Sequence, residues 1–352
     1  MRNHAHAFCS IVPPQILEHM AKNGRTPEEK DAALRALALT ARLRGRREAL
    51  AGLPQQAPPP GQLRRTIFDA NKTVELPGHL VRSEGQPASK DADVNRAYDG
   101  SGATYDFYEQ VLGRNSIDGH GMRLDSTVHY DVAYANAFWN GSEMIYGDGD
   151  GRVFGSMSAC VDVIGHELTH GVTEHTANLV YRGQSGALNE SFSDVFGILV
   201  KQWLAQAPPD KADWIIGRGL FLPGIKGVGL RSMSDPGTAY DDPALGGKDP
   251  QPADMQHYVH TTEDDGGVHL NSGIPNRAFY LAARALGGNA WEKAGHVWYE
   301  ALQALHENAG FSDAAKATIA AAADLYGAGE ADHVRGAWHQ VGVDVKAKRR
   351  AA

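Results

Sequence analysis

The sequence predicts an α+β fold with two domains behind a short N-terminal leader. The chain has 352 residues, 42% of them hydrophobic and 22% charged, which is typical of a globular protein with more than one core. Segments before residue 160 are strand-like and later ones are helical, and a proline-rich stretch at 52–61 cannot continue a helix. We therefore expect a leader and linker over 1–60, a β-rich domain over 61–180 that ends in a helix, and an α-helical domain over 181–352.

The leader is basic, whereas the rest of the chain is acidic. Residues 1–60 carry nine Lys and Arg against five Asp and Glu, a net charge of +4, and because the whole chain is −8 the remainder is −12. Such a leader can dock electrostatically on the body of the same chain. The acidic body argues against nucleic acid as the main partner. No apolar run reaches the roughly 18 residues of a membrane span, so we expect no membrane partner.

The expected elements follow from local signals. Pro13 and Pro14 predict an extended segment, and Thr26, Pro27 and two glutamates predict the start of a helix over 28–50. Strands are expected at 65–68, 73–76 and 126–130, and helices at 95–112, 160–180, 188–206, 275–286, 290–308, 312–326 and 330–340. The glycine-rich run 147–151 is expected to be a tight turn. The alternative, a calcium loop, needs a glutamate where this chain has Ala159.

The two cysteines, Cys9 and Cys160, exclude a disulfide framework and a zinc site of four thiolates. The first twenty residues contain neither the apolar stretch nor the small-residue cleavage site of a secretory signal. We therefore expect a cytoplasmic protein, with non-classical export left open.

A candidate metal site begins with His166, Glu167 and His170. Residues four apart lie above one another on a helix, so both imidazoles can bind one zinc ion, and Glu167, about 100° further round, would flank the metal. Two histidines packed in a helical core are the alternative explanation.

A third ligand is expected from a second helix, twenty residues further on. Glu190 and Asp194 are four apart and share one face. Glu190 can complete a site of two His and one Glu with the fourth position left to water. Asp194 can accept a hydrogen bond from a ligand imidazole and fix its tautomer. His175 is a competing third ligand, which we expect to be a surface or packed histidine instead.

Five segments in a fixed order resemble the thermolysin family of zinc metallopeptidases. They are NAFWNGSEM at 136–144, HELTH at 166–170, GALNESFSD at 186–194, RSMSDP at 231–236 and DDGGVHLNSG at 264–273. The leader, with CSIVPP at 9–14, is similar to the short propeptide of the protealysin-like subgroup. The resemblance implies a thermolysin-like two-domain fold with the active-site helix between the domains, and one catalytic Zn²⁺.

The family's activity is then expected here as hydrolysis of peptide bonds on the amino side of bulky hydrophobic residues. Zinc would activate a water molecule and Glu167 would act as general base. By the same resemblance, His269 and Tyr181 would stabilise the oxyanion, and Asp264 would orient His269. The residues that match the family's substrate-binding positions are Asn136, Ala137, Arg231, Val163 and Leu230.

The chain departs from the family at the calcium sites. Asp162 is kept, but Lys201, Arg218 and Ile215 stand where the family has acidic calcium ligands, and Val228 replaces an Asp of a second loop. We expect these sites to be lost. Residues 237–257 form a longer segment than in thermolysin, which leaves the rim of the cleft unassigned.

The leader and its linker suggest a zymogen that cleaves itself between about 49 and 62, with its own propeptide as a partner in cis and polypeptides as substrates. A permanently attached accessory segment is the alternative. Cys9, His4 and His6 are candidates to cap the zinc. We expect a monomer. Two rival functions stay open, a silent zinc-binding scaffold and an aminopeptidase.

Overall fold

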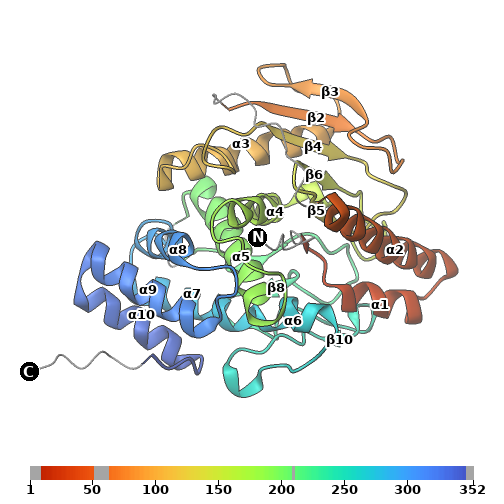
Figure 1. Ribbon diagram of the computed structural model, residues 1–352. Helices are drawn as coiled ribbons and strands as arrows, with labels where there is room; N and C mark the ends of the chain where they lie inside the picture. Colours follow the sequence, from red (N-terminus) through yellow and green to blue (C-terminus); the bar gives the residue numbers. More distant parts are fainter. Residues whose placement is uncertain (1–8, 51–62, 208–210, 346–352) are drawn as a thin grey trace, which may run out of the picture.

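The computed structural model describes residues 9–50, 63–207 and 211–345 (Figure 1). Side chains are described in these ranges except at residue 9 and residues 44–50. A mixed sheet and helix α3 (Ala92–Leu112) lie at one end, helices α4 (Val161–Glu174) and α5 (Gly183–Ala205) cross the middle, and the helices from α7 (Gly273–Leu286) to α10 (Ala328–Gln340) gather at the other end (Figure 1). The α+β prediction is therefore confirmed. No helix in the described ranges is long and apolar enough to cross a bilayer.

In the described part of the chain the main sheet has six strands, ordered β1-β5-β6-β4-β2-β3. Their bounds are β1 Cys9–Ser10, β2 Arg65–Asp69, β3 His79–Ser83, β4 Leu124–Val128, β5 Ala137–Trp139 and β6 Glu143–Tyr146. Strand β4 runs parallel to both β2 and β6, and the remaining pairs are antiparallel. The edge strand β1 comes from the leader, so the sheet is completed by residues that precede the Pro-rich linker.

The leader forms two helices, α1 (Pro14–Asn23) and α2 (Pro27–Leu50), which lie together beside the sheet (Figure 1). Pro13 is extended, as expected, but Pro14 begins a helix that was not predicted from the sequence. Proline suits the first helical turn because its missing N–H would have no partner there. Helix α1 buries Ile16, Leu17 and Met20. The expected self-cleavage region lies mostly outside the described residues.

The body helices are α3 Ala92–Leu112, α4 Val161–Glu174, α5 Gly183–Ala205, α6 Asp264–Asn271, α7 Gly273–Leu286, α8 Lys293–Ala304, α9 Phe311–Tyr326 and α10 Ala328–Gln340. Helix α4 ends at Glu174, six residues before the predicted end, where the chain turns and Asn178 takes a φ of 49°. Helix α6 lies between the helices predicted at 188–206 and 275–286, where no helix was predicted. Its first turn is irregular, because Asp265, Gly266 and Gly267 have positive φ.

The strand predicted at 73–76 is wrong. The N–H and the hydroxyl of Thr73 both donate to the carbonyl of Ala70, which makes a turn, and the strand forms at β3 instead. The strand predicted at 126–130 ends at Val128, because His129 has a φ of 53°. Short strands make two small sheets, β7 (Ile215–Ile216) with β8 (Arg231–Ser232) and β9 (Asp241–Asp242) with β10 (Gly247–Lys248).

Helices α4 and α5 pack closely because two glycines face each other. A Cβ added at Gly165 would lie 3.1 Å from the Cα of Gly197. A Cβ added at Gly197 would lie 2.5 Å from the carbonyl oxygen of Asp162 and 2.9 Å from the backbone nitrogen of His166. Larger residues would push the helices apart, so this glycine pair sets how closely side chains from α4 and α5 can meet.

Candidate metal centre and active site

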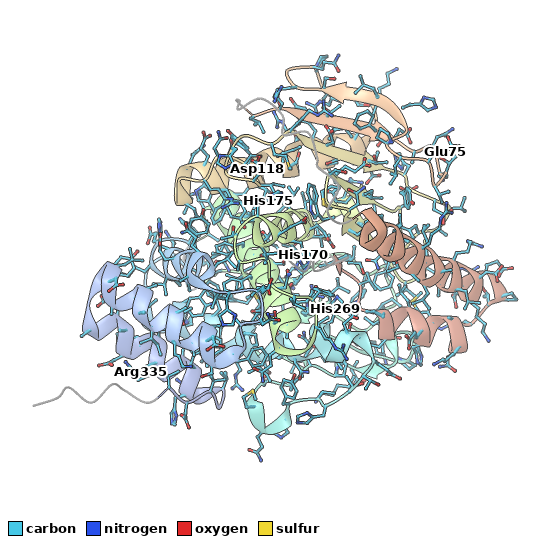
Figure 2. The ribbon with its side chains drawn as sticks, in the orientation of Figure 1. Glu75, Asp118, His170, His175, His269 and Arg335 are labelled. Atoms are coloured by element: carbon cyan, nitrogen blue, oxygen red, sulfur yellow. The ribbon has the colours of Figure 1, made fainter. Side chains whose placement is uncertain are left out.

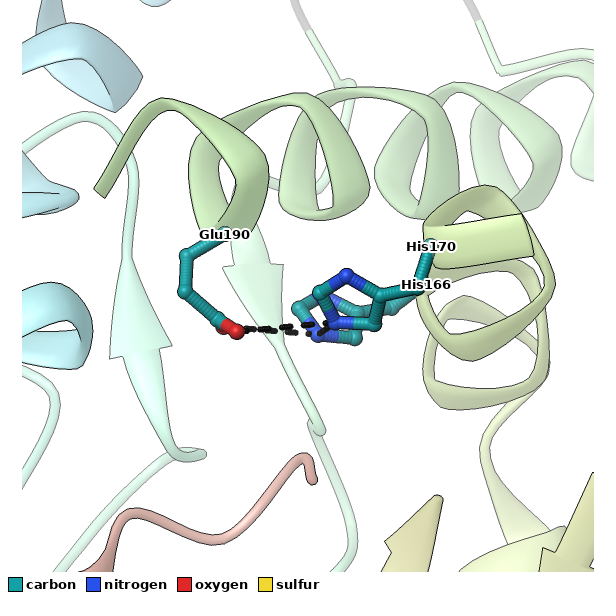
Figure 3. Close-up of side chains that lie close together, drawn as sticks. All are labelled: His166, His170 and Glu190. Carbon is teal, nitrogen blue, oxygen red and sulfur yellow. Dashed lines mark hydrogen bonds and ion pairs between the residues drawn. The ribbon is translucent and has the colours of Figure 1, made fainter. Parts of the chain in front are cut away.

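Three buried side chains from two helices converge on one point. His166 and His170 project from α4 and Glu190 projects from α5 (Figure 3). The Nε2 atoms of the two histidines are 3.0 Å apart, and each lies 3.5 Å from a carboxylate oxygen of Glu190. All three side chains are at most 3% exposed. The expected third ligand, Glu190, is thus in place, whereas His175 is exposed at the end of α4, away from His170 (Figure 2).

The hydrogen bonds around the two rings fix which nitrogen carries the proton. His166 Nδ1 donates to Asp194 Oδ1 at 2.8 Å, and His170 Nδ1 donates to Asn189 Oδ1 at 2.8 Å. Burial lowers the pKa of His170 to about 3, which keeps this ring neutral. Both Nε2 lone pairs therefore point at each other and at a carboxylate. A cation bound between them satisfies all three groups, so the donor set fits a zinc ion.

Asp194 is the centre of a buried network. Its two oxygens accept hydrogen bonds from His166, from Arg231 Nε and Nη2 at 2.8 and 2.7 Å, and from Asn276 Nδ2 at 2.8 Å. Burial alone would raise the pKa of Asp194, but the charge of Arg231 and the bonds from His166 and Arg231 hold it well below its usual range. Arg231 was expected to bind substrate, and it also anchors the carboxylate that orients His166.

Glu167 lies beside the metal ligands with one oxygen available. Its Oε2 accepts a hydrogen bond from the backbone N–H of Trp139 at 3.2 Å. Its Oε1 is buried and has no hydrogen-bond partner within the described ranges. Burial and the negative charge of Glu190 raise the pKa of Glu167 well above its ordinary value, and the backbone N–H groups of Trp139 and Ile11 oppose this. A buried carboxylate of this kind is suited to take up a proton.

His269 and Tyr181 both lie beside the carboxylate of Glu190. Figure 2 places His269 close to His170 in the middle of the molecule. The Tyr181 hydroxyl donates to Glu190 Oε1 and lies 3.3 Å from His269 Nε2. His269 Nδ1 donates to Asp264 Oδ1 at 2.6 Å, and the backbone N–H of His269 donates to the same carboxylate. Asp264 thus contacts both the imidazole and the backbone of His269, and the catalytic roles of the two residues stay predictions.

The leader crosses this site in an extended conformation. The N–H of Ile11 donates to the carbonyl of Ala137 at 3.2 Å, and the carbonyl of Ile11 accepts from Arg231 Nη1 at 3.0 Å. The side chain of Asn136 bonds to both the N–H and the carbonyl of Val12. His269 Nε2 donates to the carbonyl of Ser10 at 3.0 Å. The four residues that make these hydrogen bonds to Ser10, Ile11 and Val12 are all among the predicted site residues.

Of the remaining predicted residues, some are buried next to the site residues in the sequence, and the others lie outside the described part of the chain. Val163 is on α4, one turn before Glu167, and Leu230 directly precedes Arg231; both are at most 2% exposed. Their role in lining a substrate pocket stays a prediction. His4 and His6 fall outside the described residues, as does the side chain of Cys9, and their proposed zinc contact stays untested.

Two side chains that hold His170 were not predicted from the sequence. Asn189 and Ser193 both lie at hydrogen-bond distance from His170 Nδ1, at 2.8 and 3.0 Å. They are four residues apart, immediately before Glu190 and Asp194, so the same helical spacing could have identified them. Asn276 has no such local signal, because it reaches Asp194 from another helix.

At the expected calcium position, Lys201 lies between carboxylates. Its Nζ donates to Asp162 Oδ2 at 3.1 Å and pairs with Asp213 Oδ2 at 2.8 Å. Arg218 donates twice to Asp213. Burial lowers the pKa of Lys201, but the two carboxylates outweigh it and raise the pKa overall.

Comparison with known proteins gives consistent matches along the chain. Residues 61–174 match the family model of the thermolysin metallopeptidase catalytic domain, and residues 177–343 match that of its alpha-helical domain. An extracellular metalloprotease of Pectobacterium carotovorum subsp. carotovorum is 51% identical over 345 residues, 96% of this chain and 97% of that protein. Protease PrtS of Photorhabdus sp. (strain Az29) is 46% identical over 348 residues, 96% of this chain and 93% of that protein.

A solved structure is also similar over almost the whole chain. The precursor of protealysin, a metalloproteinase from Serratia proteamaculans, is 51% identical with a TM-score of 0.87 and covers 95% of this chain and 99% of that chain. The matched structure is a precursor, so the similarity includes the leader.

The cytoplasmic expectation is wrong. It rested only on the missing secretory signal, whereas a relative that is 51% identical over nearly its full length is named an extracellular metalloprotease. A signal pattern reports one export route, so its absence does not decide the compartment.

Proposed function

This chain belongs to the thermolysin family of metallopeptidases, in its protealysin-like branch, and is a zinc metalloendopeptidase; from this premise we propose a specificity, a mechanism and a mode of regulation. It hydrolyses peptide bonds on the amino side of bulky hydrophobic residues. It is made as a zymogen that processes itself. It acts outside the cell, as the name of its Pectobacterium relative indicates for that protein.

The path of the leader through the site is the observation that supports the proposed specificity. Ser10 presents its carbonyl to His269, and Ile11 follows with its N–H on Ala137 and its carbonyl on Arg231. A substrate held by the same groups would place its reactive carbonyl where that of Ser10 lies. The next residue would then take the position of Ile11, whose branched side chain is fully buried. Burial favours an apolar side chain there by about 2 kcal/mol over an exposed one.

The chain's own residues supply the proton transfers and the charge stabilisation. Zinc held by His166, His170 and Glu190 would, when bound, polarise the peptide carbonyl and lower the pKa of water. Glu167 accepts the proton of the attacking water on its available Oε1 and delivers it to the leaving nitrogen. His269 and Tyr181 donate hydrogen bonds to the carbonyl oxygen as negative charge develops on it.

The same contacts make the leader an inhibitor in cis. Ser10, Ile11 and Val12 use the backbone contacts that a substrate would need, so the closed chain excludes other peptides. Cleavage within residues 49–62 would release the leader, because the tether that keeps its local concentration high would be lost. We propose that the chain is divided into a leader over residues 1–60 and two catalytic domains over residues 61–180 and 181–352.

Two further features complete the proposal. Lys201 replaces calcium as the counter-charge of Asp162, and the fold needs calcium neither there nor at the loop of Val228. The enzyme acts as a monomer on polypeptides, without nucleic acid or membrane partners, in line with the net charge of −12 outside the leader.

The test is hydrolysis of casein and of a peptide library by the purified zinc-loaded chain, with the cleaved bonds identified by mass spectrometry. We expect Leu, Ile, Phe or Val directly after each cleaved bond. The Glu167→Ala variant should keep its zinc and lose hydrolysis. Zinc binding without hydrolysis of any polypeptide would favour a silent scaffold, and sequential loss of N-terminal residues would favour an aminopeptidase.

A further inference from the structure

Gln251, which lies in the long segment 237–257, contacts the backbone of His269. Its Nε2 donates to the carbonyl oxygen of His269 at 2.7 Å and to the hydroxyl of Ser272 at 3.1 Å. The Ser272 hydroxyl also donates to the His269 carbonyl, at 3.0 Å. Two side chains therefore converge on one backbone oxygen, and Gln251 itself is only 7% exposed.

His269 needs such support because its helix is short and begins irregularly. Asp265, Gly266 and Gly267 all have positive φ, so the turn before His269 is not a regular helical turn. Asp264 holds the imidazole and the backbone N–H of His269 on this side. Gln251 holds the backbone carbonyl, so side chains bind both the backbone N–H and the backbone carbonyl of His269.

Gln251 is itself fixed by its surroundings. Its backbone N–H donates to Asp249 Oδ1 at 3.1 Å, and Asp249 is 4% exposed. The segment lies tightly on the turn after His269, because a Cβ added at Gly273 would lie 2.6 Å from the carbonyl of Pro252 and 3.2 Å from the Cβ of Gln251. The amide therefore has little freedom to move away from the His269 carbonyl.

We propose that Gln251 is a positioning residue for His269 in the peptidase reaction, an inference that rests on the role proposed for His269 above. Within the described residues its hydrogen bonds go to Asp249, His269 and Ser272 and to none of the three metal ligands, so it acts by fixing the backbone from which the imidazole projects. A small displacement of His269 would weaken its hydrogen bond to the carbonyl oxygen of the substrate when charge develops there. Binding of the uncharged substrate would change much less.

The test compares Gln251→Leu with Gln256→Leu, an exposed glutamine five residues away in the same segment. Both variants are made in the zinc-loaded chain and assayed with one peptide substrate after the leader has been cleaved and removed. We expect Gln251→Leu to lower kcat by about tenfold with little change in KM. Inhibition by a phosphonamidate peptide, which imitates the developing charge, should weaken by a similar factor. Gln256→Leu should leave all three values unchanged.

A double-mutant cycle separates this inference from the proposed function. In a His269→Ala background, Gln251→Leu should have no further effect on kcat, because the group it positions is gone. If the effects of Gln251→Leu and His269→Ala on kcat were fully additive, the inference would be wrong. It would also be wrong if the activity of Gln251→Leu fell only in proportion to its zinc content or its melting temperature. If Gln251→Leu does not fold, the similarly sized Gln251→Glu, which removes the amide donor, takes its place. If His269→Ala alone has no effect, the role proposed for His269 fails instead.

Discussion

The Nε2 atom of His269 lies 3.0 Å from the carbonyl oxygen of Ser10, although the two residues are separated by 259 positions in the chain. Both ring nitrogens of His269 face acceptors, because Nδ1 bonds to Asp264. Burial opposes the charge, but Asp264 and Glu190 raise the pKa of His269 to about 9. A protonated imidazole thus contacts a leader carbonyl in the position where we expect a substrate carbonyl to lie.

Replacing Ile11 by Asp should open the leader. Ile11 is fully buried, and burying a carboxylate there would cost about 3 kcal/mol, which shifts the closed–open equilibrium by about 100-fold. We expect the uncut variant chain to hydrolyse a fluorogenic peptide from the first time points, with a gel verifying its length. Leu34→Asp, at an exposed position of α2, is the control and should stay latent. Equal latency of both variants would argue against inhibition by the leader.

Glu167→Gln should abolish proton transfer and leave the metal in place. Glu167 is not within the group of ligands, whereas His166 and Glu190 are. We expect kcat to fall by a factor of about 10² to 10⁴, with zinc content by elemental analysis unchanged. Glu75→Gln is the control, because Glu75 is exposed and far from His170 (Figure 2). Near-normal turnover by Glu167→Gln would exclude it as the base.

Asp194→Asn should weaken zinc binding. The carboxylate fixes the proton of His166 on Nδ1 and is itself held by Arg231. We expect the zinc affinity, measured by competition with a chelator, to fall about 10- to 100-fold. The buried Arg231 charge also loses its partner, so the melting temperature should fall. Asp324→Asn, at an exposed position, should change neither quantity. Unchanged zinc affinity in Asp194→Asn would contradict the orienting role.

Thermal stability should respond little to a chelator that removes calcium alone, because Lys201 neutralises Asp162. Lys201→Ala should lower the free energy of unfolding by about 3 kcal/mol, since it leaves a buried carboxylate without its cation. The control is Lys316→Ala, which breaks an exposed pair with Asp313 and should cost less than about 1 kcal/mol. A large rise in melting temperature on adding calcium would contradict this account.

Stability should fall at alkaline pH because of His129. Its two ring nitrogens contact Asp148 at 2.6 Å and Asp91 at 2.9 Å, and Lys72 lies 4.0 Å from Asp148. The hydrogen bond from His129 to Asp148, with further help from Asp91 and against burial, raises the pKa of His129 to about 9 from 6.5. Because the pKa of His129 is higher in the folded state, its protonated ring stabilises the fold fully below pH 6.5. This contribution to the free energy of unfolding is lost as the pH rises through about 9.

The measurement is the free energy of unfolding by urea between pH 6 and 10. His129→Gln should remove the part of the pH dependence that falls between the two pKa values. His120→Gln, at an exposed position, should retain it. An unchanged profile in His129→Gln would show that other groups cause the alkaline loss.

Local signals predicted most helices and the three metal ligands, because these depend on spacings within one helix. His166 and His170 are one turn apart, and so are Glu190 and Asp194. The predictions that were wrong concern the strand at 73–76, the end of the strand at 126–130, the end of α4 and the compartment. A hydrogen-bonded turn at Thr73 and the positive φ of His129 overrode strand propensity, which depends on context. After Glu174 the chain leaves the helix in a turn, in which the N–H groups of Thr176 and Asn178 donate to the carbonyl of Thr173.

By itself the sequence determined which side chains could bind zinc, because helical periodicity places them on common faces. Only the tertiary structure decided which distant groups complete the site. Asn276 reaches Asp194, Gln251 reaches the carbonyl of His269, and Ser10 reaches the imidazole of His269. These contacts join segments 18 to 259 residues apart, and no local pattern records them, since they depend on how the helices and the leader pack.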